Sequence, residues 1–376
     1  MKMLLSYIRS AVFAITAILA LAFFAYAQSG RIQPTPTPTP FDETLRVVTE
    51  EIKLNVLAFD EKGQFFSDVT ANDLVITENN ILHQPASVRR LPANVLILMD
   101  TGGEMRSVKS LDQTRKIARG VVESLRPGDM VALMQYSDKA EIVGDWTSDK
   151  EEMLAAIKRT NFGRKSVFID ALKLATDFLV KNPIENKHLV LITDGTDSAG
   201  RSSAKFDAFQ RLLATDISVN VLSYTAMEIA DIEPRTKMVS NTPAPKAMPD
   251  EVINQLPPDV KIAAQRPQVG PTVNMDRKLL KTLKSRKSDL EISQGQLEKL
   301  AEGTNGEFIL PDTVDEMVEK SALVGRMIDS SYVVTYMPKI PVVETRGIAE
   351  RNIEVTSRRP GLVVQARRRL LIDHSK

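Results

Sequence analysis

Apolar runs that resemble buried strands alternate with helical segments from residue 95 onward. This alternation constrains the fold of the 376-residue chain more than any other feature. The runs are nearly continuous in apolar residues: VLILMD (95–100), MVALMQY (130–136), HLVLIT (188–193) and SVNVLSY (218–224). Strands of this kind are typical of a parallel sheet that is covered by helices on both faces. The pattern therefore predicts an α/β domain over residues 91–330, built on a doubly wound, mostly parallel sheet.

Shorter segments, in which apolar and polar residues alternate, flank this domain on both sides. Residues 45–90 contain three strand candidates, which are too few to form a stable sheet by themselves. Residues 331–372 contain further candidates, such as SYVVTYMP and the stretches on either side of Pro360-Gly361. We therefore expect the two chain ends to form one small β-sandwich, into which the α/β domain is inserted.

The first 27 residues have the features of a secretory signal peptide. Two basic residues, Lys2 and Arg9, precede an apolar run at 11–25, and Ala25-Tyr26-Ala27 fits an A-x-A cleavage site. The run is shorter than the roughly 20 residues that a membrane-spanning helix needs. We expect cleavage after Ala27 and a periplasmic or secreted bacterial protein with no stable membrane insertion. An uncleaved anchor is the alternative.

Two proline-containing stretches interrupt the folded regions. A Pro/Thr-rich linker at 28–44 contains PTPTPTP, a sequence that favours stiff, extended polyproline. A Pro-rich insertion is predicted at about 226–288, within the α/β domain. It contains the basic helix candidate RKLLKTLKSRK (277–287). We interpret this helix either as a solvated face or as a docking site for an acidic partner.

Composition and motifs argue against several classes of function. Lys and Arg number 49 and Asp and Glu 48, so the net charge of +1 gives no global sign of nucleic-acid binding. The absence of cysteine excludes disulfides, thiolate zinc sites and a cysteine nucleophile. The sequence contains no G-x-S-x-G, H-E-x-x-H or P-loop motif, and His83, His188 and His374 lie where a structural or solvated role is expected. We therefore expect a protein that is not an enzyme.

Polar and acidic residues follow the strands at their carboxyl ends. DTGGE begins at Asp100, FGRKSVFIDAL enters a helix, and DGTD spans Asp194 to Asp197. In an open parallel sheet, ligands bind at the carboxyl ends of the strands, where the strand order reverses. The sequence therefore predicts a ligand-binding rim at this edge, made of Thr101, Gly102, Gly103 and Asp197 beside the acids.

These segments resemble the von Willebrand factor type A domain, in its exported bacterial form with flanking β segments. The resemblance covers roughly residues 94–310, and DAL (170–172) and VLITDG (190–195) match the family well. It implies a Rossmann-like fold, an adhesion or scaffold role through an unidentified protein partner, and a metal-ion-dependent adhesion site. The positions that correspond to this site are Asp100, Gly102, Glu104, Ser166 and Asp194.

The site departs from the family pattern, because Gly102 and Glu104 replace two serines and Ser166 replaces a threonine. Magnesium requires a near-ideal octahedron of six oxygens, and Gly102 removes one of them. Two interpretations stay open. Asp100, Glu104, Ser166 and Asp194 could hold a weakly bound divalent cation, with calcium preferred over magnesium, or Arg106 or Arg164 could neutralise the acids without a metal. A metal-dependent hydrolase that uses Asp100, Glu104 and Asp194, and a purely structural envelope module, are the alternative functions.

Overall fold

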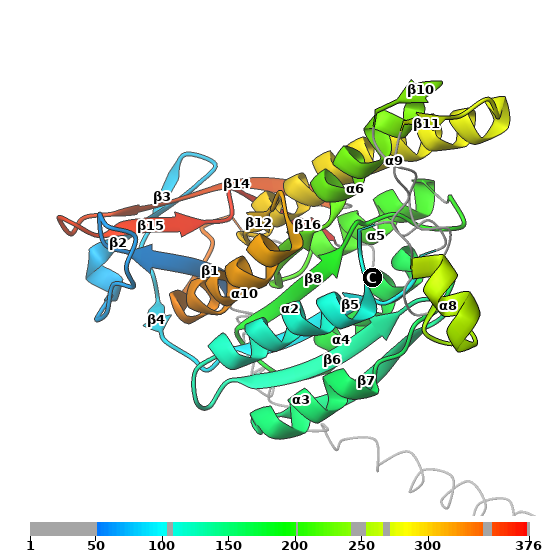
Figure 1. Cartoon of the computed structure of the whole chain (residues 1–376). Helices are drawn as coiled ribbons and strands as arrows, with labels where there is room; N and C mark the ends of the chain where they lie inside the picture. The colour runs from blue at the N-terminus through cyan, green and yellow to red at the C-terminus, as the bar shows by residue number, and fades with distance from the viewer. Residues whose placement is uncertain are drawn as a thin grey trace, which may run out of the picture. The chain divides into compact units, whose positions relative to one another are not determined.

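Figure 1 shows a computed structural model of the chain, which describes residues 51–103, 108–200, 202–241, 253–265, 271–340 and 348–373. These residues belong to one compact unit, Thr49–Lys376. The predicted signal peptide (1–27) and linker (28–44) lie outside the described residues. In the described part of the chain, no helix is both long enough and apolar enough to cross a bilayer.

A six-stranded sheet forms the centre of the α/β domain, in the spatial order β12-β9-β8-β5-β6-β7. The strands are β5 (Asn94–Asp100), β6 (Met130–Tyr136), β7 (Ala140–Thr147), β8 (Lys187–Thr193), β9 (Ser218–Ser223) and β12 (Phe308–Ile309). All neighbouring strands are parallel except β7, which pairs with β6 in the antiparallel direction at one edge. The expected doubly wound, mostly parallel sheet is thus confirmed.

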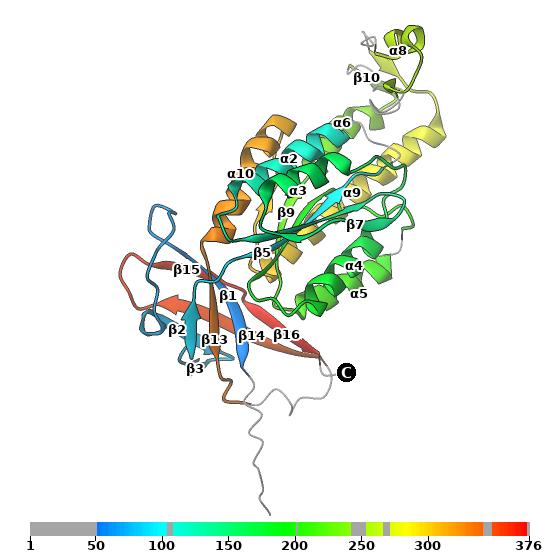
Figure 2. The same ribbon diagram turned by 90° about the horizontal axis from the view of Figure 1, so that it is seen from below.

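Helices cover both faces of this sheet, as Figure 2 shows. One face carries α2 (Leu111–Ser124), α3 (Lys150–Arg159), α6 (Thr225–Ile232) and α10 (Val314–Asp329). The other carries α4 (Phe168–Lys181), α5 (Ser202–Leu213) and α9 (Arg277–Gly303). Within β5, Ile97 and Met99 pack on the first face, while Leu96 and Leu98 pack on the second. Because successive strand residues point to opposite faces, β5 must be apolar at nearly every position.

The two chain ends fold together into a β-sandwich, as expected. One sheet has the order β15-β1-β13-β4 and the other β16-β14-β2-β3. The N-terminal strands are β1 (Ile52–Phe59), β2 (Leu74–Glu78), β3 (Ile81–His83) and β4 (Ser87–Arg89), with a short helix η2 (Ala71–Asp73) before β2. The C-terminal strands are β13 (Ser331–Tyr336), β14 (Ile348–Ser357), β15 (Val363–Ala366) and β16 (Arg369–Asp373).

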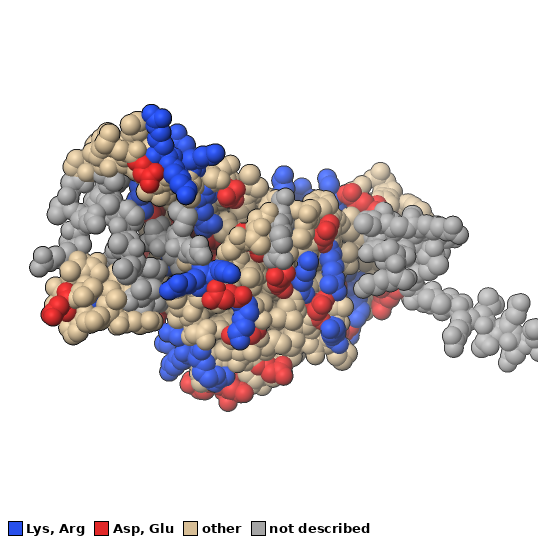
Figure 3. Space-filling model, turned by 90° about the vertical axis from the view of Figure 1, so that its right-hand side faces the viewer, with Lys and Arg blue, Asp and Glu red and all other residues tan. Residues whose placement is uncertain are grey.

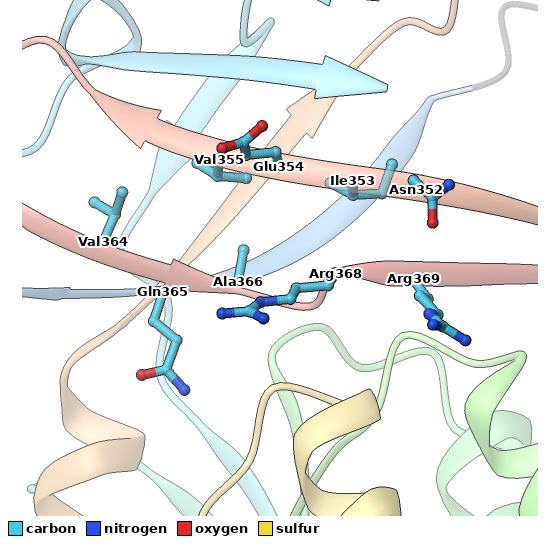
Figure 4. Close-up of a pocket in the computed structure, with 9 residues that line it drawn as sticks. All are labelled: Asn352, Ile353, Glu354, Val355, Val364, Gln365, Ala366, Arg368 and Arg369. Carbon is cyan, nitrogen blue, oxygen red and sulfur yellow. The ribbon is translucent and has the colours of Figure 1, made fainter. Parts of the chain in front are cut away.

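Strand β14 changes partner along its length. Its first half pairs with β16 and its second half with β2, whereas β15 joins the opposite sheet through β1. The hairpin strands β14 and β15 therefore separate into different sheets, and a hollow opens between them (Figure 4). Val355 lies along β14, and Val364 and Arg368 lie on the other wall of the hollow.

A buried polar network ties the sandwich to the start of β8. Asn186 Oδ1 lies 2.9 Å from His188 Nε2 and accepts hydrogen bonds from the side chains of Asn55 and Ser331. Burial lowers the pKa of His188 to about 3, so the imidazole is neutral at physiological pH. His188 therefore has the structural role expected of it.

The stretch at about 226–288 contains several short elements among its described residues. After α6 come η3 (Glu233–Thr236), β10 (Val239–Ser240), α8 (Pro258–Gln265) and β11 (Thr272–Val273). Strands β10 and β11 pair with each other in the antiparallel direction. The candidate basic helix is the N-terminal part of α9, which continues for 27 residues in total.

A chain that ends at Ser330 should aggregate rather than fold. Strand β1 would lose both of its neighbours, β13 and β15, and β2 would lose β14, which exposes unpaired strand edges. Size-exclusion chromatography and thermal unfolding, with a chain that ends at Asp373 as the control, test this. A monomeric truncation that unfolds cooperatively would show that the C-terminal strands are dispensable.

Candidate functional site

The candidate site lies at the carboxyl ends of β5 and β8, which are adjacent parallel strands in the middle of the sheet. The chain order reverses here, because β6 lies on one side of β5 and β8 on the other. Asp100 is the last residue of β5, and Asp194 directly follows β8. Both side chains are buried. The fold therefore brings together two acids that are 94 positions apart, as the strand-end pattern predicts.

A lysine ammonium group lies between the two acids. Lys109 Nζ is 2.5 Å from Asp100 Oδ2 and 3.5 Å from Asp194 Oδ2. The Lys109 side chain is only 2% exposed, and its ammonium group lies 5.6 Å from the centre of the Tyr224 ring. The capping box that Ser110 forms with Gln113 begins α2 directly after Lys109 and so positions this residue. The carboxylates thus face a cation supplied by the chain itself.

Arg286, from the middle of α9, contributes a second cation. Its Nη2 donates to Asp194 Oδ2 at 3.0 Å, and its Nη1 donates to Thr196 Oγ1 at 2.7 Å. Thr196 in turn donates its hydroxyl and its backbone N–H to Asp194 Oδ1. On Asp100, Oδ1 accepts the backbone N–H of Gly102. All four carboxylate oxygens of the two acids therefore accept at least one donor from the chain.

These contacts keep Asp194 ionised although it is buried. Burial by itself would raise its pKa, but the charges of Lys109 and Arg286 and the two Thr196 hydrogen bonds outweigh burial and hold the pKa well below its usual range. The buried charge of Asp194 and the cations beside it therefore depend on each other. Removing one member of a buried ion pair leaves an uncompensated charge, which typically costs about 3–5 kcal/mol of stability.

A third acid, Glu228 on α6, is buried near this cluster. Glu228 is 1% exposed, and neither of its carboxylate oxygens has a hydrogen-bond partner among the described residues. Burial and the charge of Asp194 raise the pKa of Glu228 to about 7, against the opposing charges of Lys109 and Arg286. Glu228 is therefore largely protonated below neutral pH, whereas Asp194 stays charged.

Gly102 occupies the position at which the family resemblance calls for a serine, and the structure explains why no side chain is present. A Cβ atom on Gly102 would lie 1.8 Å from the Lys165 carbonyl oxygen and 2.8 Å from Ser137 Cα. The loop that contains Lys165 fills the space that a serine would need. The missing hydroxyl is thus part of the local packing.

The other predicted site residues hold the rim loops in place. Ser166 donates its hydroxyl to the Thr196 carbonyl at 3.0 Å. Asp197 accepts the backbone N–H of Ile169 and so satisfies a donor in the first turn of α4. Thr101 is buried and bonds to the Tyr136 carbonyl, and Gly103 has a positive φ of 126°.

Of the two arginines that the sequence offered to neutralise the acids, the structure describes only Arg164. Glu104 and Arg106 lie outside the described residues. Arg164 is exposed, and its backbone N–H, not its side chain, is held by Asp138. Among the described residues, the cations that contact the acids are Lys109 and Arg286. Lys109 is not part of any recognisable sequence motif. Arg286 falls in the basic stretch 277–287, and the sequence does not show which residues this stretch contacts in the folded chain.

The described residues do not fit a divalent ion between Asp100 and Asp194. The Lys109 ammonium group lies where such an ion would have to contact both carboxylates, and Gly102 offers no side-chain oxygen. Within the described residues, no three His, Cys, Asp or Glu side chains are grouped so that they could hold a metal ion. Calcium and magnesium both need several convergent oxygens, so the donor set suits an ammonium cation better.

Replacing Glu228 with Gln should stabilise the protein at pH 8 and have little effect at pH 4.5. The folded pKa of about 7 lies above the ordinary glutamate pKa of 4.5, so the stability that protonated Glu228 contributes is present below pH 4.5 and is lost as pH rises through 7. Glutamine imitates the neutral acid at every pH. The expected gain at pH 8 in the free energy of unfolding is about 1–3 kcal/mol.

Denaturant unfolding of both proteins between pH 4.5 and 8 measures this difference. Glu302→Gln, at an exposed position on α9, serves as the matched control. Its free energy of unfolding should change with pH in the same way as that of the wild type. If the free energy of unfolding of Glu228→Gln also changes with pH as that of the wild type does, Glu228 is ionised over the whole range from pH 4.5 to 8.

A model of the von Willebrand factor type A domain matches residues 95–196. No curated protein matches the chain. The conserved hypothetical protein BatB from Bacteroides thetaiotaomicron is similar at 15% identity, over 62% of this chain and 98% of that chain, with a TM-score of 0.34.

Two further solved structures are also similar to the chain. An aerotolerance-related membrane protein from Bacteroides fragilis NCTC 9343 is 18% identical over 63% of this chain and 98% of that chain, with a TM-score of 0.36. A von Willebrand factor type A protein from Catenulispora acidiphila is 11% identical over 83% and 76%, with a TM-score of 0.42. The family match runs from β5 to the loop after β8 and includes both Asp100 and Asp194. Residues 95–196 thus match the von Willebrand factor type A domain.

Proposed function

We propose that this domain binds another protein at the strand-end rim around Asp100 and Asp194, and that it does so without a bound divalent ion. The observation that carries the proposal is the Lys109 ammonium group, 2.5 Å from Asp100 and 3.5 Å from Asp194. The family resemblance implies a protein-interaction module whose ion binds at these acids. Here an internal cation already offsets their charge.

The rim around the buried acids presents side chains that a partner could contact. Arg164, Lys165 and Ser198 are exposed. The loop that carries Arg164 and Lys165 is fixed through its backbone, because Asp138 accepts both N–H groups, so the two cationic side chains extend from a positioned loop. Such a rim offers positive charge, and charge of this kind gives an interface specificity and a faster association rate.

The geometry favours binding over hydrolysis. A carboxylate that activates water must accept a proton from it, within hydrogen-bonding distance. The oxygens of Asp100 and Asp194 instead accept donors from the chain, two of which are charged. We further propose that the protein acts after export and cleavage behind Ala27. This proposal rests on the positive, apolar and A-x-A features of the first 27 residues.

Replacing Lys109 with Met should convert the site into one that depends on a divalent cation. Without its ammonium group, the two buried acids lose the cation between them, and Arg286 still contacts Asp194. Stability in EDTA should therefore fall by about 3–5 kcal/mol. Calcium should restore part of this loss, because it tolerates irregular oxygen coordination. Thermal unfolding in EDTA and in excess calcium gives the readout, and the wild type should respond to neither.

Lys205→Met is the matched control for this experiment. Lys205 is also buried, but its ammonium group donates to the Gly195 carbonyl at 2.7 Å and to Ser293, not to a carboxylate. Its loss should lower stability without creating a response to calcium. A wild-type protein whose unfolding temperature rises with calcium or magnesium would contradict the proposal, because it would show that an ion binds despite Lys109.

Partner binding should depend on the rim and be insensitive to EDTA. We expect the double variant Arg164→Glu/Lys165→Glu to lose the proteins that the immobilised wild-type chain retains from an envelope extract, as identified by mass spectrometry. The matched double variant Lys62→Glu/Arg358→Glu changes two exposed residues of the sandwich by the same charge and should retain them. Loss of binding only in the sandwich variant would favour the structural-module alternative. Loss in EDTA would show that an ion is required.

A further inference from the structure

The N-terminal part of α9 extends beyond the layer of helices that covers the sheet. Figure 1 shows this end of α9 projecting from the α/β domain together with β10 and β11, and Figure 2 shows it projecting together with β10. Leu290, Leu297 and Leu300 are buried in the second half of the helix. In its first half, the buried side chain of Leu283 contacts the small cluster around Ile232. A helix of 27 residues is ~40 Å long, so its first turns lie well away from the sheet core.

Large apolar side chains are exposed at this end. Val239 of β10 and Val273 of β11 are a cross-strand pair, and the Met238 carbonyl accepts the backbone N–H of Asn274. These contacts bring the β10 and β11 segments to one place, directly before the start of α9. The exposed fractions there are 61% for Met238, 60% for Val239, 62% for Val273, 79% for Met275 and 43% for Leu279. Clustered exposure of this kind marks an interaction surface more often than scattered exposure does.

Positive charge surrounds the same end. The exposed cations are Lys237, Arg277, Lys278, Lys281 and Lys284. Arg277, Lys281 and Lys284 follow i, i+4, i+7 spacing and so form one stripe along the helix. Figure 3 shows Lys and Arg side chains gathered at the upper end of the molecule, where α9 begins. We call these five cations and the five apolar residues the basic–apolar tip.

The five tip cations differ from their neighbours in lacking ion-pair partners among the described residues. Nearby cations deeper in the structure have acidic partners, as Arg235 has Asp231 and Lys287 has Glu233. No ion pair is recorded for the five tip cations within the described residues. Arg277 and Lys278 also lie in the first turn of α9, where the helix dipole disfavours positive charge by about 0.3–1 kcal/mol each. Asp276 caps the helix with its carboxylate and is the nearest acid in sequence.

We propose that the basic–apolar tip docks on a membrane surface that carries anionic phospholipids. Lys and Arg close to such a surface each contribute roughly 1 kcal/mol, and flanking apolar side chains enter the headgroup boundary. The tip is made of Met, Val and Leu without an aromatic residue, and half of its members are Lys or Arg. Four of the five cations are Lys, a residue that is depleted in protein interfaces and common on the polar face of elements that lie on anionic membranes. The composition therefore favours lipid over an acidic protein.

Vesicle binding tests the proposal with the chain from Gln28, which retains the whole compact unit and lacks the apolar run at 11–25. We expect it to co-sediment with phosphatidylcholine vesicles that contain about one-third phosphatidylglycerol, and not with phosphatidylcholine alone. Binding should weaken at high salt, because screening shortens the reach of surface charges. Equal binding to both vesicle types, or to neither, would overturn the proposal.

Variants separate the contribution of the tip's cations from that of its apolar side chains. Lys281→Gln/Lys284→Gln should lower the affinity roughly 10- to 30-fold, from about 1 kcal/mol per cation. Val273→Ser/Met275→Ser should lower it as well, while leaving the salt dependence in place. Lys116→Gln/Lys158→Gln removes two exposed cations from α2 and α3 and should change nothing. All of these positions are exposed, so the variants should unfold at the wild-type temperature, and a control that loses as much affinity as the tip variants would overturn the proposal.

Two further readouts distinguish a membrane from an acidic protein. Met275→Trp should shift its fluorescence to shorter wavelength only with anionic vesicles, because the ring then enters the lipid boundary. If soluble polyglutamate binds as tightly as the vesicles, and Val273→Ser/Met275→Ser binds it unchanged, the tip is a docking site for an acidic polypeptide and the membrane proposal fails.

Discussion

The ion pair between Lys109 and Asp100, with Asp194 beside it, is the constraint on which the functional edge of this domain depends. Two carboxylates meet at the ends of β5 and β8 because the chain order of the sheet reverses there. Buried and close together, two carboxylates would repel each other. The ammonium group of Lys109 prevents this from within the chain. A domain whose family resemblance calls for a metal ion thus has a covalently attached cation at the same acids.

A second cation reaches the cluster from a distant part of the chain. Arg286 belongs to α9, and its guanidinium group binds Asp194 and Thr196. The same helix carries the basic–apolar tip at its N-terminal end and packs on the sheet through its C-terminal half. One helix therefore links the charged site, the sheet core and the exposed tip. Glu228, also buried, completes the cluster with a carboxyl group that is uncharged below neutral pH.

Much of the fold followed from local patterns. The nearly continuous apolar runs at β5, β6, β8 and β9 predicted a parallel sheet covered by helices on both faces. The strands at each chain end are too few to form a stable sheet alone, which predicted a shared sandwich. Both predictions are confirmed. Less could be predicted at the edges of these elements. The partner change of β14 between β16 and β2 depends on pairing between strands far apart in sequence, which alternation alone does not specify.

The sequence by itself determined that Asp100 and Asp194 would meet, because strand ends of a parallel sheet converge on one edge whatever the loops do. It also showed that Gly102 leaves the metal pattern incomplete. Only the tertiary structure decided which cations offset the acids. A lysine nine positions from Asp100 and an arginine 92 positions from Asp194 become neighbours through helix packing, and no periodicity records such a contact. The space at Gly102 was likewise decided by the Lys165 loop, because van der Waals contact between distant segments is a property of the folded chain.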